Sequence, residues 1–187
     1  MDTLYIKNMV CDRCKMAVEN TLLSQHLHPK DIELGKVTIY EELTPQQRSQ
    51  LATALGHLGF ELLNDKHQQI IEQIKSAIIE LVHYHDNAPD LNLSHYLSIK
   101  LHTEYSALSK LFKGITGNTI ECYYIAQRIE RVKELIKNDE LSLTQIAVLL
   151  NYSSVSYLSN QFKAVTGMTP SQFKTSDKIT RKALDKI

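Results

Sequence analysis

Residues 1–64 combine short β-prone stretches with two longer amphipathic ones. Period-two alternation and β-branched or aromatic residues predict four strands in this part of the chain. They lie at Thr3–Lys7, Asp31–Leu34, Lys36–Tyr40 and Phe60–Leu63. Helical spacing of apolar residues predicts a helix over Asp12–Leu23, and a second helix begins at Thr44-Pro45 and ends at Gly59. The predicted order is strand, helix, strand, strand, helix, strand, with a hairpin turn at Gly35.

From Asp65 onward the pattern is helical. The first helix of this part is long, with Ile70, Ile74, Ile78 and Leu81 at helical spacing, and it fades near His83–His85, before Asn87-Ala88-Pro89. Shorter helices with capping sequences follow. The predicted capping boxes are Asn118–Glu121, Ser142–Gln145 and Thr169–Gln172. We expect the domain boundary near Asn64–Lys66, where the period of the pattern changes.

Two segments of the helical part share one layout. They read LSHYLSIKLHTEYSALSKLFKGITG over 93–117 and LTQIAVLLNYSSVSYLSNQFKAVTG over 143–167. Each predicts a short amphipathic helix, a tight turn and a second helix that ends in Phe-Lys-x-x-Thr-Gly. This is the shape of a helix-turn-helix unit, whose second helix can lie in the major groove of DNA.

The stretches IAQRIERVKELI (125–136) and LSLTQIAVLLNYSSVSYLSNQFKAVTGMTPSQFK (141–174) carry a more specific signal. Together with the two units, they make residues 90–175 resemble the AraC/XylS-type bacterial DNA-binding domain. The resemblance implies two helix-turn-helix units joined by a linker helix, here Thr119–Lys137, with recognition helices in successive major-groove segments on one face of double-stranded DNA.

The second helix of each unit has one apolar face and one polar face. In the second unit Leu158 and Phe162 are predicted core residues, and the opposite face is free to read DNA. Asn can bind adenine through two hydrogen bonds, Ser can pair either way, and Val can touch a thymine methyl group. By the resemblance, the candidate DNA-binding residues are Ser106, Ser109, Lys110, Val155, Ser156, Ser159, Asn160 and Lys163. The alternative is a polar face that only meets solvent.

The two units depart from the family pattern at their turns. His102 and Asn151 stand where the family often has glycine, and Asn in particular tolerates the left-handed conformation. The second unit keeps the small Ala147, where two helices approach closely, whereas the first is expected to place the bulkier Leu97 there. The first unit is therefore the weaker match.

A pair of cysteines lies in the first strand-to-helix loop, in the sequence Met9-Val-Cys11-Asp-Arg-Cys14. With this motif and the predicted order of elements, residues 2–63 resemble the heavy-metal-associated domain, which implies a ferredoxin-like α/β sandwich. In that family the position of Met9 usually packs inward, so the expected metal ligands are Cys11 and Cys14.

Two thiolates on one loop suit a soft ion such as Cu(I), and thiolates also suit zinc. The helix beginning near Asp12 directs its N-terminal dipole at the thiols and is expected to lower their pKa. Two cysteines alone do not complete a tetrahedral zinc site, so a second chain or a histidine would be needed. Two alternatives stay open: a dithiol redox pair, and a domain that kept its fold for dimerisation or docking after losing the metal.

Composition narrows the function classes only slightly. The 187 residues carry no net charge, residues 1–64 have net charge −2 and residues 65–187 have +2, so charge does not indicate a partner. Three cysteines are too few for a disulfide framework, and Cys122 is expected to be a packed thiol. We find no secretory signal, no apolar run that could span a membrane and no catalytic constellation, and a site at His83 and His85 is disfavoured because residues two apart do not share a helical face.

These observations lead to one interpretation of the chain. The predicted regions are a heavy-metal-associated-like domain at 1–64, a connecting helix and linker at 65–89, an AraC-type DNA-binding domain at 90–175 and a C-terminal tail at 176–187. We expect a cytoplasmic, non-enzymatic transcription regulator that binds double-stranded DNA and responds to Cu(I) or zinc at Cys11 and Cys14. A second copy of the chain or RNA polymerase is its other expected partner. The alternative is a metal-trafficking or thiol-redox protein with a helical docking module.

Overall fold

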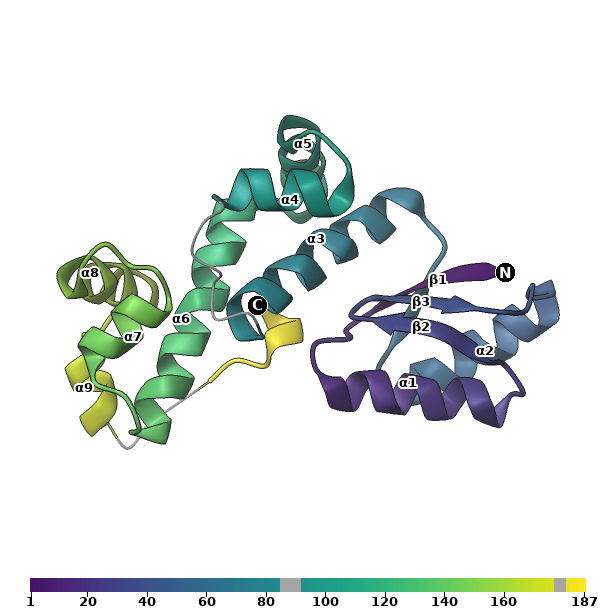
Figure 1. The fold of residues 1–187 in the computed structure, drawn as a ribbon, viewed down its shortest axis with the longest axis horizontal. Helices are drawn as coiled ribbons and strands as arrows, with labels where there is room; N and C mark the ends of the chain where they lie inside the picture. Colours follow the sequence, from purple (N-terminus) through teal and green to yellow (C-terminus); the bar gives the residue numbers. More distant parts are fainter. Residues whose placement is uncertain (85–91, 177–180) are drawn as a thin grey trace. The chain divides into compact units, whose positions relative to one another are not determined.

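The computed structural model describes residues 1–84, 92–176 and 181–187, and its first part is an α/β arrangement (Figure 1). Its elements are β1 (Asp2–Lys7), α1 (Asp12–Ser24), β2 (Pro29–Glu33), β3 (Lys36–Ile39), α2 (Pro45–His57) and β4 (Glu61–Leu63). The order of elements is the predicted one. The strands form one antiparallel sheet in the order β2-β3-β1-β4, so β1 and β3 are central. β2 begins at Pro29, two residues before the predicted start at Asp31.

The core of this part lies between the sheet and the helices α1 and α2 (Figure 1). Leu4 of β1 is paired with Val37 of β3, and both are fully buried because alternate residues of a strand point to the same face. The helices contribute Val18 and Leu22 from α1 and Leu51 and Leu55 from α2. The helix start predicted at Thr44 carries a capping box, in which Thr44 accepts from the backbone of Gln47 and the Gln47 side chain accepts from the backbone of Thr44.

The β2–β3 turn approaches α3 (Lys66–His83) so closely that only glycine fits. Gly35 has a φ of 73°, in the left-handed region, and a Cβ atom there would lie 2.5 Å from the Ser76 hydroxyl oxygen. A larger residue at this position would push the turn and α3 apart. The turn predicted at Gly35 is therefore confirmed, and its close contact with α3 holds it in place.

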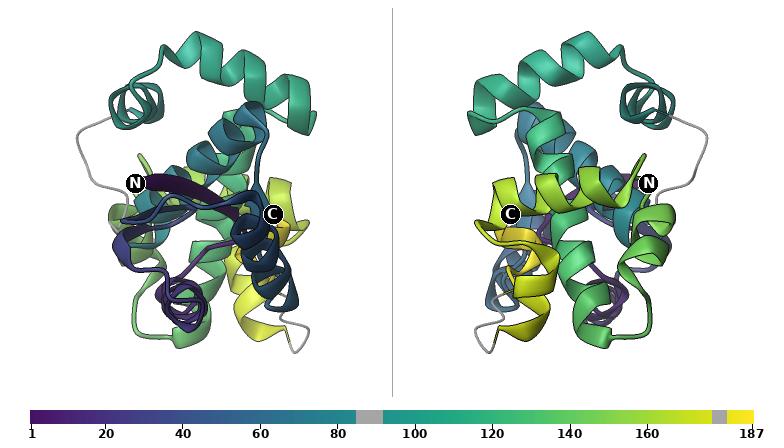
Figure 2. Two further views of the ribbon diagram at one scale, coloured as in Figure 1. Left: turned by 90° about the vertical axis from the view of Figure 1, so that its right-hand side faces the viewer. Right: turned by 90° about the vertical axis from the view of Figure 1, so that its left-hand side faces the viewer.

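The rest of the described chain is helical. Its helices are α4 (Leu93–Leu101), α5 (Tyr105–Thr116), α6 (Ile120–Asn138), α7 (Leu143–Leu149), α8 (Val155–Thr166), α9 (Pro170–Thr175) and the short 3-10 helix η1 (Leu184–Lys186). Helices α7, α8 and α9 gather around the C-terminal part of α6 (Figure 2). One apolar cluster joins these four helices, with Val132, Ile146, Phe162 and Phe173 among its buried members.

The predicted helix starts can be compared with the caps in the structure. The capping boxes at Ser142 and Thr169 are confirmed. At α6 the prediction of Asn118 as the cap is wrong: Thr119 is the N-cap, and its hydroxyl accepts from the backbone of Cys122 at 3.1 Å. Cys122 is exposed, so the expectation of a packed thiol is also wrong. It lies in the first turn of α6, on the outward side.

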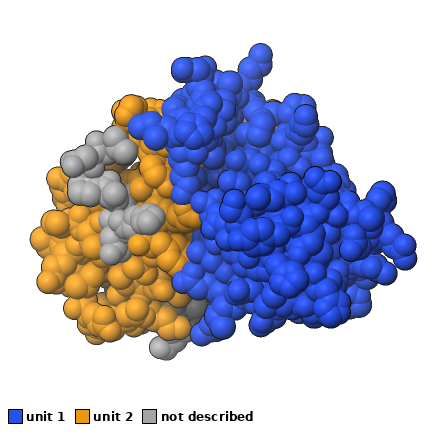
Figure 3. Space-filling view, turned by 45° about the vertical axis from the view of Figure 1, so that its right-hand side comes forward, with its two compact units in different colours: residues 1–77, 97–111 blue, residues 78–96, 112–187 orange. Residues whose placement is uncertain are grey.

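The described chain divides into two compact units, and each is considered by itself (Figure 3). One compact unit holds residues 1–77 and 97–111, and the other compact unit holds residues 78–96 and 112–187. The regions expected from the sequence, 1–64, 65–89, 90–175 and 176–187, stay predictions. His85, the turn at Asn87–Pro89 and tail residues 177–180 lie outside the described residues.

Candidate nucleic-acid interface and cysteine loop

Helix α8 is held in place by a tight turn after α7. Asn151 occupies the left-handed region with a φ of 53°, as its place in the turn predicts. The backbone N–H of Tyr152 then donates to the Ala147 carbonyl at 2.8 Å, and the Ser154 hydroxyl caps α8 by accepting from the backbone of Tyr157. Leu158 and Phe162 are fully buried, so their predicted role in the core is confirmed. The buried side of α8 fixes which side faces outward.

The outward side of α8 carries the candidate DNA-binding residues of the second unit. Ser156, Asn160 and Lys163 are exposed, and Val155 and Ser159 are half-buried beside them. Spacings of three and four residues put them on one face of the helix. This face presents hydroxyl, amide and ammonium groups, which are the groups that read base edges and phosphates.

The first unit has the corresponding face on α5. Ser106 and Lys110 are exposed, Ser109 is half-buried, and Leu108 and Phe112 are buried on the opposite side. The predicted DNA-contact residues therefore lie on the polar sides of α5 and α8, except Val155, which packs partly against the apolar cluster around α6. Contact with DNA itself stays a prediction.

The turn of the first unit corrects one sequence expectation. His102 is left-handed with a φ of 49°, and the backbone N–H of Thr103 donates to the Ser98 carbonyl at 3.3 Å. This bond is the counterpart of the bond from Tyr152 to Ala147, so Ser98 stands where the second unit has Ala147. The expectation that Leu97 stands there is wrong, and the first unit keeps a small residue at this place.

The two units also end alike. The ring centres of Phe112 and Tyr123 lie 5.9 Å apart. The corresponding pair is Phe162 and Phe173, each fifty positions later in the chain, with ring centres 5.4 Å apart. Each second helix is followed by a glycine in the left-handed region, Gly117 or Gly167. These matches lie in the buried residues and turns of the two units, which we call their frame, and not on their polar faces.

One residue of this region was not found by sequence reasoning. Arg128 of α6 is buried, and its guanidinium group donates to the Leu150 carbonyl in the turn before α8. It also lies over the ring of Tyr152, 3.8 Å from the ring centre. The signal that could have revealed it is an arginine among the apolar positions of the linker helix, next to Ile129 and Val132.

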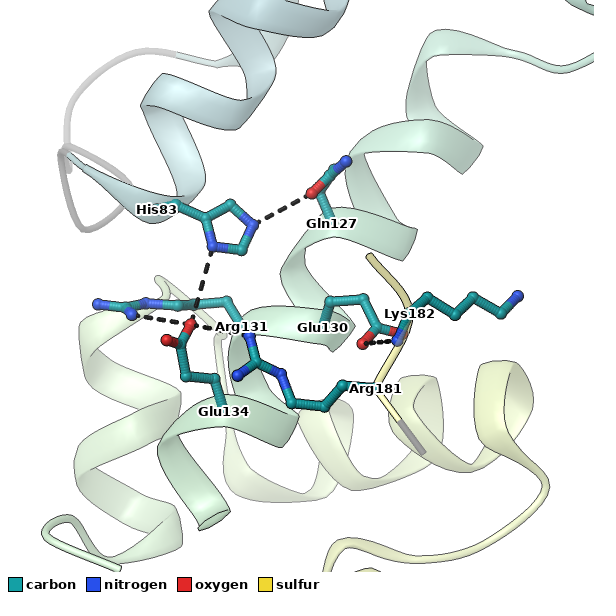
Figure 4. Close-up of polar contacts among 7 residues, drawn as sticks. All are labelled: His83, Gln127, Glu130, Arg131, Glu134, Arg181 and Lys182. Atoms are coloured by element: carbon teal, nitrogen blue, oxygen red, sulfur yellow. Dashed lines mark hydrogen bonds and ion pairs between the residues drawn. The ribbon is translucent and has the colours of Figure 1, made fainter. Parts of the chain in front are cut away.

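A polar cluster on α6 joins that helix to the end of α3 and to the C-terminal segment (Figure 4). Glu134 lies at its centre: its Oε2 is 3.1 Å from Arg131, 3.4 Å from Arg181 and 4.0 Å from His83 Nδ1. His83 Nε2 lies 3.1 Å from the side-chain oxygen of Gln127. Burial lowers the pKa of His83, and the hydrogen bond that its ring donates to the Gln127 side-chain oxygen opposes this effect.

The second part of the cluster centres on Glu130 (Figure 4). This buried carboxylate accepts from Lys133 Nζ at 2.6 Å and from the backbone N–H of Lys182 at 3.1 Å. Gln127 donates to the Leu184 carbonyl at 3.3 Å and to the Tyr123 hydroxyl at 2.9 Å. These bonds hold the segment that begins at residue 181 against α6.

In the α/β part of the chain, Cys11 and Cys14 lie together at the start of α1. Cys11 is the N-cap residue, both thiols are half-buried, and their sulfur atoms are 3.3 Å apart. Met9 is fully buried, which agrees with the expectation that it packs inward. Burial raises the pKa of the Cys14 thiol, and the hydrogen bond with Cys11 adds to this. The expectation that the helix dipole lowers the pKa is therefore wrong for Cys14.

The residue that opens the cysteine loop is held by two hydrogen bonds. Asn8 adopts a φ of 72°, its side chain donates to the Gly59 carbonyl at 2.9 Å, and its backbone N–H donates to Glu72 Oε1 at 3.1 Å. Glu72 lies on α3 and is buried, which raises the pKa of its carboxyl group. The loop is thus anchored at its first residue.

Within residues 1–84, 92–176 and 181–187, no three His, Cys, Asp or Glu side chains gather as a metal site would require. Cys11 and Cys14 thus have no third protein ligand beside them in the described chain. None of the described helices is long and apolar enough to cross a membrane.

Comparison with known proteins bears on the helical part. Residues 97–176 match the family model described as "Helix-turn-helix domain". The chain is 25% identical over 126 residues to the HTH-type transcriptional regulator CdhR of Pseudomonas aeruginosa, which covers 67% of this chain and 33% of CdhR. It is 28% identical over 99 residues to the xylose operon regulatory protein of Haemophilus influenzae, 52% of this chain and 25% of that protein.

A shorter match extends to the xylose operon regulatory protein of Escherichia coli, 30% identical over 69 residues, which are 37% of this chain and 18% of that protein. The chain thus spans a third or less of the length of these relatives. No solved structure matches it. The match of residues 97–176 to a helix-turn-helix model and the similarity to transcriptional regulators support the AraC/XylS-type resemblance of the C-terminal part. The resemblance of the first part to the heavy-metal-associated domain stays a prediction.

Proposed function

We propose that this chain binds double-stranded DNA sequence-specifically through α5 and α8 and regulates transcription. The observation that carries the proposal is the polar face of α8, in which Ser156, Asn160 and Lys163 are exposed on a helix whose other face is locked into the core. A rigid helix with such a face, in a region that matches a helix-turn-helix model, suits insertion into a major groove.

Each candidate residue has a proposed role on DNA. Asn160 binds adenine through its amide, and Lys163 approaches phosphate. In the first unit Lys110 offers a point charge where the second has Asn160. The hydroxyl groups and the valine complete the reading faces, at Ser106, Ser109, Val155, Ser156 and Ser159.

A mobility-shift titration tests this proposal. The wild-type chain should bind a selected fragment more tightly than random DNA of the same length, with an affinity that falls as salt rises. Asn160→Ala should weaken binding to the selected fragment by about 1–3 kcal/mol and leave binding to random DNA unchanged. Asn20→Ala, the same change at an exposed position of α1, is the matched control and should bind as wild type does. Equal binding of both DNAs by the wild type would contradict the proposal.

We further propose that the first part is a ferredoxin-like domain of the heavy-metal-associated kind, with Cys11 and Cys14 as ligands of Cu(I) or zinc. The order of its six elements, the antiparallel sheet order β2-β3-β1-β4 and the buried Met9 support this. Two thiols on one loop fit a soft ion. The sulfur atoms of Cys11 and Cys14 lie 3.3 Å apart on that loop, so both would hold the same ion.

A bound ion would supply positive charge at the two thiolates, and the chain's own residues orient the loop. Asn8 and Glu72 anchor its start, and α1 fixes Cys14. Competition with a Cu(I) chelator under reducing conditions tests the site: wild type should retain one ion per chain and Cys11→Ser/Cys14→Ser none. If both retain the same amount, the metal proposal fails. If the ion is retained but DNA affinity is the same with and without it, the site is not a sensor.

A further inference from the structure

The inference concerns Arg128, which lies in the middle of the helix between the two helix-turn-helix units. Its side chain is only 8% exposed, although arginine is rarely buried without a partner. Nη2 donates to the Leu150 carbonyl, and the guanidinium group stacks 3.8 Å above the ring of Tyr152. These two contacts fall on either side of Asn151, the left-handed residue of the turn. Arg128 therefore holds the turn from both sides.

Tyr152 carries this contact on to α8. Its hydroxyl donates to Gln161 Oε1 at 2.8 Å, and Gln161 lies one position after Asn160 on the same helix. Tyr152 itself is buried, and burial raises its pKa to about 12, so the hydroxyl keeps its proton at physiological pH. A continuous path of contacts thus runs from Arg128 through Tyr152 to the helix with the proposed reading face.

We propose that Arg128 is a positioning residue for base recognition by the second helix-turn-helix unit. This proposal rests on the proposed function and adds a residue that acts without touching DNA. The guanidinium group sets the turn and, through Tyr152 and Gln161, the orientation of α8 about its axis. Base-edge hydrogen bonds are directional, so a small rotation of α8 would weaken discrimination between bases.

Burial separates this role from a phosphate contact. An arginine that neutralises a phosphate must reach the surface. Arg128 is instead buried, donates a hydrogen bond to the Leu150 carbonyl and stacks its planar guanidinium group on the ring of Tyr152. Its Nε has no hydrogen-bond partner in the described structure. Lysine cannot reproduce the planar stack and the directed donor together, so Arg128→Lys keeps the charge and removes the geometry.

The experiment measures binding to the selected DNA site and to single-base variants of it, at several salt concentrations, for wild type, Arg128→Lys and Tyr152→Phe. Arg131→Lys is the matched control, because it makes the same change three residues later on α6, where the side chain faces Glu134. Thermal unfolding of each variant, followed by circular dichroism, gives the folded fraction.

Arg128→Lys should lower discrimination by roughly tenfold at the bases that α8 reads and leave it unchanged at the bases that α5 reads. The slope of affinity against salt should stay at its wild-type value, whereas loss of a phosphate contact would reduce it by about 1. Tyr152→Phe, which removes only the hydroxyl bond to Gln161, should reproduce the effect more weakly. Arg131→Lys should keep the wild-type base preferences.

Three results would overturn the inference and leave the proposed function standing. Wild-type base preferences in folded Arg128→Lys would show that the turn needs no arginine, and a salt slope reduced by about 1 would make Arg128 a phosphate contact. A uniform loss of affinity that follows the folded fraction would make its role structural only. A wild-type chain without any base preference would instead refute the proposed function and this inference with it.

Discussion

The two helix-turn-helix units have nearly the same frame and different outer faces. From 104 to 113 and from 154 to 163 the two second helices have the same sequence of exposed, half-buried and buried positions. Each unit has a left-handed residue in its turn, at His102 or Asn151, and each second helix is followed by a left-handed glycine. The frame is thus set by the positions of apolar residues and turns, which the two segments share.

The differences lie in the outer face and in the support of the turn. Lys110 in the first unit corresponds to Asn160 in the second, so a point charge replaces an amide that can bind adenine. Tyr152 is buried and reaches Gln161, whereas its counterpart Thr103 is exposed and donates to the nearby Leu101 carbonyl. We infer that the second unit is the more specific reader and that the first contributes more through charge.

The largest expected effects test the shared frame. Phe112→Ala and Phe162→Ala should each lower the free energy of unfolding by about 3–5 kcal/mol, because both rings are buried and truncation leaves a cavity. Urea unfolding followed by circular dichroism measures this. The matched controls Ile115→Ala and Val165→Ala, at positions 48% and 50% exposed, should change it by about 0.5 kcal/mol or less. A loss confined to one of the two phenylalanines would show that the frames differ.

The next effect separates the outer faces. Asn160→Ala should lower specific DNA affinity by about 1–3 kcal/mol without changing the salt slope, because it removes a base contact. Lys110→Ala should weaken binding to all sequences and reduce the salt slope by about 1 if its charge meets phosphate. Fluorescence-anisotropy titrations at several salt concentrations distinguish the two. The same slope and the same loss for both variants would remove the contrast between the units.

A smaller effect concerns the turns. His102→Gly should stabilise the protein by up to about 1 kcal/mol, because glycine adopts a positive φ without strain, and Asn151→Gly should gain less, because Asn already tolerates this conformation. His95→Gly, at an exposed position inside α4, should have the opposite sign. Differential scanning calorimetry provides the comparison. Equal gains at both turns would mean that His102 is not strained.

The smallest expected effect tests the support of α6. Burial holds the pKa of His83 below its usual value near 6.5, while Gln127, Glu134, Arg131 and Arg181 face the imidazole. As pH falls below about 6.5, the unfolded chain takes up a proton that the folded chain resists, so the folded state loses stability. His83→Gln should reduce this dependence between pH 7 and pH 5.5 in urea unfolding. An unchanged dependence would show that His83 does not contribute.

Local patterns account for what could be predicted. Helical spacing placed Leu158 and Phe162 in the core, and a glutamine three residues after a Ser or Thr identified the capping boxes at Ser142 and Thr169. Where two adjacent residues could cap α6, at Asn118 and Thr119, only the hydrogen bond in the structure decides.

Contacts between distant residues account for what was missed. The sequence pattern does not align Ser98 with Ala147, because the two turns match only when residues are counted back from His102 and Asn151, their left-handed residues. Glu130 accepts a hydrogen bond from the backbone of Lys182, and Arg128 donates one to the Leu150 carbonyl. The partners are far apart in the sequence, so the local pattern does not predict either pairing. The pKa of Cys14 follows its burial, which the helix dipole did not predict.

The most direct measurement is selection of DNA from a random pool by the wild-type chain under reducing conditions, with and without Cu(I), followed by sequencing. The account predicts an enriched motif with two half-sites about one helical turn apart. Asn160→Ala should lose the half-site of α8 and keep that of α5. A selected pool that binds no more tightly than the starting pool would contradict the central claim that this chain reads DNA sequence.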